Sequence, residues 1–227
     1  MKRILIKYIM DIKDITKIIK TWLEPKGFVQ TSNKRLFVKD KGFYLIVASV
    51  HPHKAYDGFC FDLAVKFLWS TSEDISYDYT VGDSSVYGQE DPQPTLGAIL
   101  YNGAKLEDEL AYLMQEADRR IDVYESLSDY QAFLNRLQNR RDFVSIVNRD
   151  FDKRDKAKAV ALVLCGRASE AQEIFVDNSP YDSVSERFAN SCLNYEDFER
   201  ELLDVVNNLR RRLSTKMKIK LEDIEKV

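Results

Sequence analysis

Histidine is scarce in this chain of 227 residues, which carries only His51 and His53. Imidazole is the usual general base and metal ligand near neutral pH, so Ser–His–Asp, Cys–His or histidine-ligated metal chemistry must use one of these two side chains. They flank Pro52 where a predicted strand ends, and extended backbone directs alternate side chains to the same side. With Asp57 as a third ligand, the spacing predicts a metal site, and a pair of exposed loop histidines is the alternative.

The second candidate is an acidic, tyrosine-rich segment over residues 72–94, which has six carboxylates and no basic residue. Residues 1–71, by contrast, hold 13 Lys and Arg against 6 Asp and Glu. A segment of this length, also rich in Gly, Pro and Ser, predicts a long loop, and long loops are commonly functional or disordered. Its acidic side chains are Glu73, Asp74, Asp78, Asp83, Glu90 and Asp91, and its tyrosines are Tyr77, Tyr79 and Tyr87.

Negative potential combined with rigid aromatic side chains suits the binding of a basic protein surface. The predicted partner-binding residues are Tyr77, Asp78, Tyr79, Asp83, Tyr87, Glu90 and Asp91. The alternative is a solvated loop that associates with the basic hairpin of its own domain.

Other polar residues favour structural roles. Asp62 and Lys66 share the polar face of a predicted strand, where they could form an acid–base site, but a charge pair on the solvated side of the sheet is favoured. The cysteines, Cys60, Cys165 and Cys192, are odd in number and lack a C-x-x-C spacing. This pattern favours a reducing cytoplasm and structural thiols.

Several classes of protein lose support. No P-loop, dinucleotide-binding, zinc-protease or nucleophile-elbow motif occurs, so no cofactor is predicted and a non-enzyme is favoured over an enzyme. The net charge of −3 and pI of about 5.6 argue against a dedicated nucleic-acid binder. The run Arg210–Arg211–Arg212 closes a helix that acidic residues open, as the helix dipole favours. No run of 18 apolar residues or secretory leader is recognised, so no membrane partner is expected.

The elements that must position these residues change from mixed to helical along the chain. The hydrophobic periodicity predicts a helix over 11–24, strands over 28–31, 35–39, 43–50 and 59–69, a helix of about 20 residues from 106, and further helices with the last starting near 194. In the strand 59–69 every odd position is apolar. We therefore predict an α+β fold: an N-terminal helix and an antiparallel β-sheet covered by a long helix, followed by an all-α C-terminal region. The predicted domains are 1–126 and 127–227.

Part of the chain resembles a known family. A helix that ends in Leu23-Glu24-Pro25-Lys26-Gly27-Phe28, a basic hairpin with Lys34, Phe37 and Phe43, and the strand Phe59-Cys60-Phe61-Asp62-Leu63-Ala64-Val65 resemble the bacterial domain of unknown function 4304 family over about residues 11–125. The family has no established activity or catalytic residues. The resemblance implies a bacterial cytosolic protein, and small α+β families of this kind are frequent among toxin-immunity proteins.

Together these observations favour a cytoplasmic, non-enzymatic protein-binding module, of which a toxin-immunity protein is one form, with a basic-surfaced partner for the acidic segment. The alternative function is a metal-assisted hydrolase that uses the His51 and His53 loop.

Overall fold

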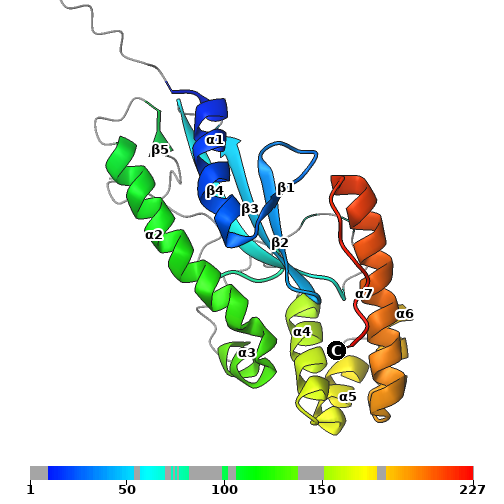
Figure 1. Cartoon of the computed structure of the whole chain (residues 1–227). Coiled ribbons are helices and arrows are strands. Elements are labelled where there is room, and N and C mark those ends of the chain that lie inside the picture. Colours follow the sequence, from blue (N-terminus) through cyan, green and yellow to red (C-terminus); the bar gives the residue numbers. More distant parts are fainter. Residues whose placement is uncertain are drawn as a thin grey trace, which may run out of the picture.

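A computed structural model of the chain describes residues 10–53, 57–69, 73, 75, 77–81, 99–101, 106–137, 151–177 and 183–226 (Figure 1). The strands within these ranges are β1 (Val29–Gln30), β2 (Leu36–Asp40), β3 (Tyr44–Pro52), β4 (Gly58–Phe67) and β5 (Ile99–Leu100). The helices are α1 (Ile12–Leu23), η1 (Glu24–Lys26, a 3-10 turn), α2 (Leu106–Glu125), η2 (Ser126–Ser128, a 3-10 turn), α3 (Tyr130–Leu137), α4 (Phe151–Leu164), α5 (Ala168–Asp177), α6 (Ser183–Ser191) and α7 (Tyr195–Met217). This order confirms the predicted α+β class.

The five strands found in the described ranges form one antiparallel sheet in chain order, β1-β2-β3-β4-β5. The longest pairing joins β3 to β4, from Tyr44 opposite Phe67 to Pro52 opposite Phe59. Each strand folds back beside the preceding one, which is the arrangement that short connections between alternating apolar runs favour. The helices α1 and α2 run beside one another across one face of this sheet (Figure 1).

The helix α1 begins and ends where its sequence signals place it. Asp11 accepts hydrogen bonds from the backbone N–H groups of Lys13 and Asp14, and the Asp14 carboxylate accepts one from the Asp11 N–H. This reciprocal capping satisfies N–H groups that have no partner inside the helix. The chain leaves η1 through Gly27, whose φ of +83° is a conformation that favours glycine. The helix buries Ile15, Ile19 and Leu23 against the sheet.

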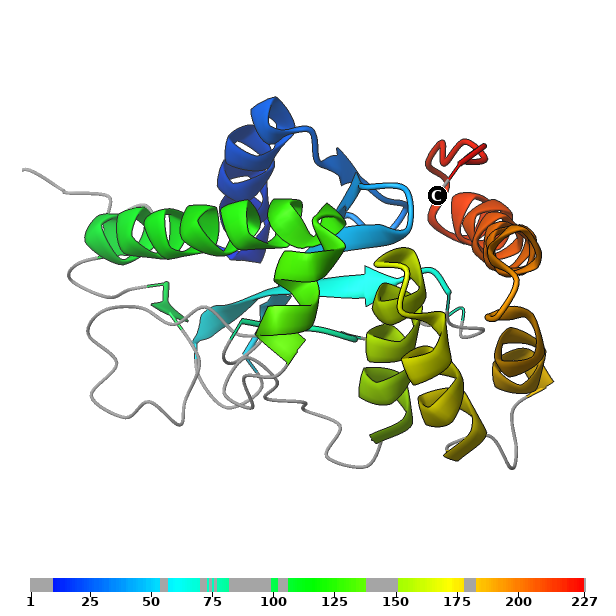
Figure 2. The same cartoon turned by 90° about the horizontal axis from the view of Figure 1, so that it is seen from below.

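The odd-numbered residues of β4 face α1, α2 and α3 and form an aromatic core there. Phe61 meets the Trp22 ring of α1 edge to face at 6.1 Å between centroids, and Phe67 meets Phe133 of α3 at 5.5 Å. Figure 2 shows α1 and α2 on the same side of the sheet. The apolar alternation in the sequence therefore marks the face that the helices cover.

The opposite face of β4 is also buried, which corrects the prediction of a solvated polar face. All ten residues of β4 are buried, including Asp62 at 7% exposure and Lys66 at 0%. Alternation distinguishes the two faces of a strand, but it does not show whether the polar face is covered by other parts of the same chain. Both charged side chains must therefore be compensated inside the protein.

The helix α7 is fixed to the β2–β3 hairpin by one buried arginine. It begins beside Asn194, where the sequence predicts the start of the last helix, and Asn194 is its N-cap. Further along the helix, Arg210 is 2% exposed and donates two hydrogen bonds to the carboxylate of Asp40, at 2.7 and 2.5 Å. Its guanidinium also donates to the carbonyl oxygens of Gly42 at 2.7 Å and Glu222 at 2.5 Å. Arg210 therefore joins the sheet, α7 and the C-terminal tail.

The hydrophobic core runs across residue 126, where the sequence predicts a domain boundary. One contiguous cluster of buried residues includes both the sheet and the C-terminal helices. At the far end of α7, the Met217 carbonyl accepts a hydrogen bond from the Ser32 N–H at 2.7 Å. Figures 1 and 2 show α4, α5, α6 and α7 gathered beside the sheet, away from the start of α2. The helical region thus packs onto the N-terminal region, and the boundary stays a prediction.

Candidate functional site

The two candidate sites predicted from the sequence meet at one side chain, Asp62. His51 Nδ1 lies 3.5 Å from Asp62 Oδ2, and the Tyr77 hydroxyl donates to the same oxygen at 3.3 Å. Tyr77 Oη also lies 2.9 Å from Ser49 Oγ. Ser49 and Asp62 are direct cross-strand partners, and His51 lies opposite Cys60, so the β3–β4 register brings these groups together.

Two weak acids, Tyr77 and Cys60, stay protonated at neutral pH within this polar cluster of Ser49, His51, Cys60, Asp62 and Tyr77. Burial, followed by the negative charge of Asp62, raises the pKa of the Tyr77 hydroxyl well above its usual value. The same two causes raise the pKa of the Cys60 thiol to about 11, so Cys60 is a thiol and a poor nucleophile at neutral pH. His51 is the accessible member, with a side chain 46% exposed against 10% for Asp62. The cluster therefore joins β3 to β4 through Asp62, and His51 is the member that faces solvent.

The predicted metal ligands are not brought together. Among the residues that the structure describes, which include His51, His53 and Asp57, no three His, Cys, Asp or Glu side chains are close enough to hold a metal ion. The prediction relied on strand alternation beyond His51, but β3 ends at Pro52. The His53 N–H instead bonds to the Gly58 carbonyl at 3.0 Å.

Part of the acidic segment packs inside the protein and does not form a surface patch. Asp78 has a side chain only 2% exposed and accepts a hydrogen bond from the Phe67 N–H at 2.8 Å. Its carboxylate lies 3.9 Å from the fully buried ammonium of Lys66. Tyr79 is 1% exposed and forms a bridge with Val65 on the edge of β4. Asp78 and Tyr79 were predicted to bind a partner, and this part of the prediction is wrong because both side chains are enclosed.

Of the other acidic residues of this segment, Glu73 is described and forms an ion pair, and the rest lie outside the described residues. Glu73 lies 3.2 Å from the guanidinium of Arg212, and its carbonyl accepts a hydrogen bond from Lys216 at 3.0 Å. Both basic residues belong to α7, so this acidic residue contacts the chain's own C-terminal helix. The remaining predicted binding residues, Asp83, Tyr87, Glu90 and Asp91, lie outside the described residues.

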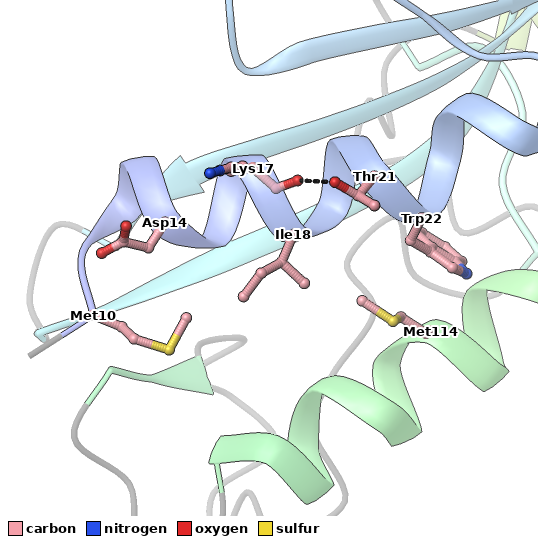
Figure 3. A pocket seen from close by; sticks show the side chains of 7 residues that line it. All are labelled: Met10, Asp14, Lys17, Ile18, Thr21, Trp22 and Met114. Atoms are coloured by element: carbon pink, nitrogen blue, oxygen red, sulfur yellow. Dashed lines mark hydrogen bonds between the residues drawn. The ribbon is translucent and has the colours of Figure 1, made fainter. Parts of the chain in front are cut away.

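An open groove between α1 and α2 is a candidate binding site that the sequence reasoning missed. Its volume is about 570 Å³. Figure 3 shows Ile18 and Trp22 of α1 and Met114 of α2 pointing into the space between the helices. The described residues that line it are Met10, Asp14, Lys17, Ile18, Thr21, Trp22 and Met114. The Thr21 hydroxyl donates to the Lys17 carbonyl at 3.0 Å, so it is engaged within α1. The floor of the groove is therefore apolar.

The groove exists because the apolar stripe of α1 is wider than the face that the sheet covers. Ile15 and Ile19 are fully buried, whereas Ile18 and Trp22 are only partly buried on the side toward α2. On α2, Met114 stands beside the buried Leu113 and is partly buried. The signal available in the sequence was therefore a second apolar row on α1, Ile18 and Trp22 at i and i+4, beside the buried row that contains Ile15 and Ile19.

The two ends of the groove differ in charge. At the end nearest the C-terminus of α1, Lys26 forms an ion pair with Asp118 of α2 at 2.7 Å, and its ammonium lies 5.2 Å from the centre of the Trp22 ring. At the other end lie Asp14 of α1 and the first turn of α2, which carries Glu107. Glu107 precedes Met114 by seven residues, two helical turns, and shares its side of α2. One end is thus closed by an ion pair and the other is acidic.

Comparison of the chain with models of protein families, with curated proteins and with solved structures gave no significant match. The resemblance to the domain of unknown function 4304 family therefore stays a prediction. Among the helices that the structure describes, none combines the length and apolar character needed to cross a membrane.

Proposed function

We propose that this protein is a protein-binding module and that the groove between α1 and α2 receives apolar side chains of its partner. The observation that supports the proposal is the partly buried row of Ile18, Trp22 and Met114 across an open groove. Tryptophan and methionine are enriched where proteins bind one another, since tryptophan contributes a large contact area and methionine adapts its shape.

The form of the groove favours a protein over a small ligand. Small-molecule sites of roughly 300–1,000 Å³ bury most of the ligand surface. This groove has a volume in that range, about 570 Å³, but among the described residues its lining is limited to α1, Met10 just before it and Met114 of α2, and it is open on the side away from the helices. A small apolar molecule would remain largely hydrated there, whereas a protein surface would cover the groove from above.

The charge at the open end favours a basic partner, the class of partner that the sequence predicts for the separate acidic segment 72–94. Asp14 and Glu107 lie there, and the neighbouring Asp108 is exposed as well. Complementary charge of this kind increases the association rate and fixes orientation more than it adds affinity.

Two variants at neighbouring positions test the proposal. Met114→Lys places a charge in the groove, whereas Gln115→Lys adds the same charge at an exposed neighbouring position. Proteins retained by the immobilised wild-type chain are identified by mass spectrometry and then compared between the two variants. The proposal expects a partner that is retained by the wild type and by Gln115→Lys and is lost with Met114→Lys. Equal retention by both variants would exclude the groove as the binding surface.

The acidic residues beyond the described ranges supply a second test of a basic partner. Replacing Asp83, Glu90 and Asp91 by Asn or Gln is expected to weaken capture of that partner and to reduce its sensitivity to salt. Unchanged capture would remove these residues from the proposal. The narrower class of a toxin-immunity inhibitor is tested by co-expression with a nuclease encoded beside the gene, where protection of the host is the expected result.

A further inference from the structure

The walls of the groove are two helices, and this limits the backbone conformation of whatever lies between them. The main-chain N–H and C=O groups of α1 and α2 bond within each helix, so the groove offers no strand edge to an incoming chain. An extended peptide would place its own polar backbone against Ile18, Trp22 and Met114, and each unpaired group would cost about 1–3 kcal/mol. A helix satisfies its backbone groups internally and avoids that cost.

We infer that the partner segment held by the groove is an amphipathic α-helix with a basic end, an inference that rests on the proposed function above. Its apolar face would pack onto Ile18, Trp22 and Met114, so that three helices lie side by side. A helix in a groove presents anchors at i, i+3 or i+4 and i+7, which suits the lengthwise row of apolar side chains in Figure 3.

The length of the walls sets the length of the docked helix. The helix α1 has 12 residues, and at 1.5 Å per residue it is about 18 Å long. A partner helix of about three turns therefore spans the groove. The ion pair between Lys26 and Asp118 closes the groove at the C-terminal end of α1, so the partner helix extends past the other end.

The acidic end specifies the charge of the partner. Asp14 lines the groove near the start of α1, and Glu107 lies in the first turn of α2, on the helix face that carries Met114. A lysine or arginine in the terminal turn of the partner helix complements the charge of these acidic first turns. Lys17 lies along the α1 wall and disfavours basic residues in the middle of the partner segment.

Two synthetic peptides of identical composition test this inference. The first is a 14-residue leucine and lysine peptide with leucines at helical spacing and lysines at one end. The second contains the same residues with leucines at every other position, which is amphipathic as a strand. Binding is followed by the fluorescence of Trp22 in a Trp69→Phe background, because the chain has only two tryptophans. The expected result is saturable binding of the helical peptide only, accompanied by a gain of helix in far-ultraviolet circular dichroism.

The groove variants decide where the peptide binds. Met114→Lys is expected to weaken binding of the helical peptide by roughly tenfold or more, the equivalent of about 1.4 kcal/mol. Gln115→Lys is the matched control and should leave the affinity within about twofold of the wild type. Asp14→Asn with Glu107→Gln should weaken binding less than Met114→Lys and should reduce its salt dependence.

The other outcomes separate this inference from the proposed function. Equal binding of both peptides, lost with Met114→Lys, would overturn the helical occupant and keep the groove as a binding site. No binding of either peptide would overturn the inference and count against the groove as well. Concentration-dependent dimerisation in sedimentation that Met114→Lys abolishes would show that the occupant is a second copy of this chain, which also overturns a partner helix.

Discussion

The pair of Asp40 and Arg210 joins the sheet to α7, and removing its members one at a time should have unequal effects on stability. Asp40→Asn preserves the shape of the side chain but leaves the Arg210 guanidinium, 2% exposed, beside neutral acceptors only. Arg210→Met leaves Asp40, whose side chain is 35% exposed and which keeps a hydrogen bond from the Gly42 N–H at 3.0 Å. The carboxylate can therefore be hydrated, whereas the guanidinium cannot.

The magnitudes follow from this asymmetry. An uncompensated buried charge costs about 3–5 kcal/mol, and the partial exposure of Asp40 places Asp40→Asn near 3 kcal/mol. Arg210→Met removes the donors to the carbonyls of Gly42 and Glu222, at about 1 kcal/mol each, for a total of about 2 kcal/mol. The double variant has no buried charge and should also cost about 2 kcal/mol. Adding Arg210→Met to Asp40→Asn should therefore restore about 1 kcal/mol of stability.

The free energy of unfolding is measured for the wild type, the two single variants and the double variant by urea unfolding at one pH, followed by circular dichroism and tryptophan fluorescence. The values are comparable when the slope m is the same for all four proteins. For a chain of this size, 3 kcal/mol corresponds to a fall of about 6–12 °C in Tm. The coupling should persist in 1 M NaCl because the pair is buried. Arg211→Met is the matched control, since Arg211 pairs with Asp223 on the surface and any effect should disappear in salt. A double variant that is less stable than the wild type by the sum of the two single effects, about 5 kcal/mol, would refute the reasoning.

Two further predictions concern the partly buried Tyr77 and the buried Tyr124. Tyr77→Phe removes the hydroxyl that contacts both Ser49 and Asp62, and it should lower the free energy of unfolding, measured in urea, by about 1–2 kcal/mol. The control Tyr112→Phe, at an exposed position, should change that free energy little. Equal effects of the two variants would contradict the role of the cluster. Burial raises the pKa of Tyr124 to about 12, so the native state keeps a proton that the unfolded chain loses near pH 10. The contribution of Tyr124 to stability should thus be intact below about pH 10 and should fall by about 1.4 kcal/mol per pH unit as the pH rises toward 12. Tyr124→Phe should reduce this slope of stability against pH. An unchanged slope would contradict the raised pKa of Tyr124.

The fold was predictable where local patterns determine structure. The strand predicted over 59–69 is β4 (Gly58–Phe67), and the helix predicted from 106 is α2 (Leu106–Glu125). The starts of α1 and α7 were predictable because each follows a short polar side chain, Asp11 or Asn194, that can cap a helix. These features depend on spacing within a few residues of the same element.

The candidate site was less predictable because its contacts come from distant parts of the chain. Asp62 and Tyr77 belong to segments that the sequence pattern treats separately, and only the return of residues 77–79 to the edge of β4 brings them together. The same return encloses Asp78 beside Lys66, which changes an apparently surface charge into an internal one. The groove was missed because Ile18 and Trp22 share one face of α1 with the buried Ile15 and Ile19, and helical spacing does not show which part of that face the sheet covers.

The outer edge of β4 is completed by several small pieces of the chain. Two residues of β5 pair with its first residues, and Tyr79 and the carboxylate of Asp78 bond to its last part. All of these pieces lie after β4 in the sequence. At roughly 5–20 residues per second, a ribosome needs about 2–7 s to translate the distance of about 33 residues from the end of β4 to the end of β5. During that interval a nascent chain carries a ten-residue strand, charged only at Asp62 and Lys66, with an uncovered edge, and such an edge is prone to pairing with another chain. The acidic segment that follows β4 therefore emerges while that edge is still open, and its charges oppose the association of neighbouring nascent chains.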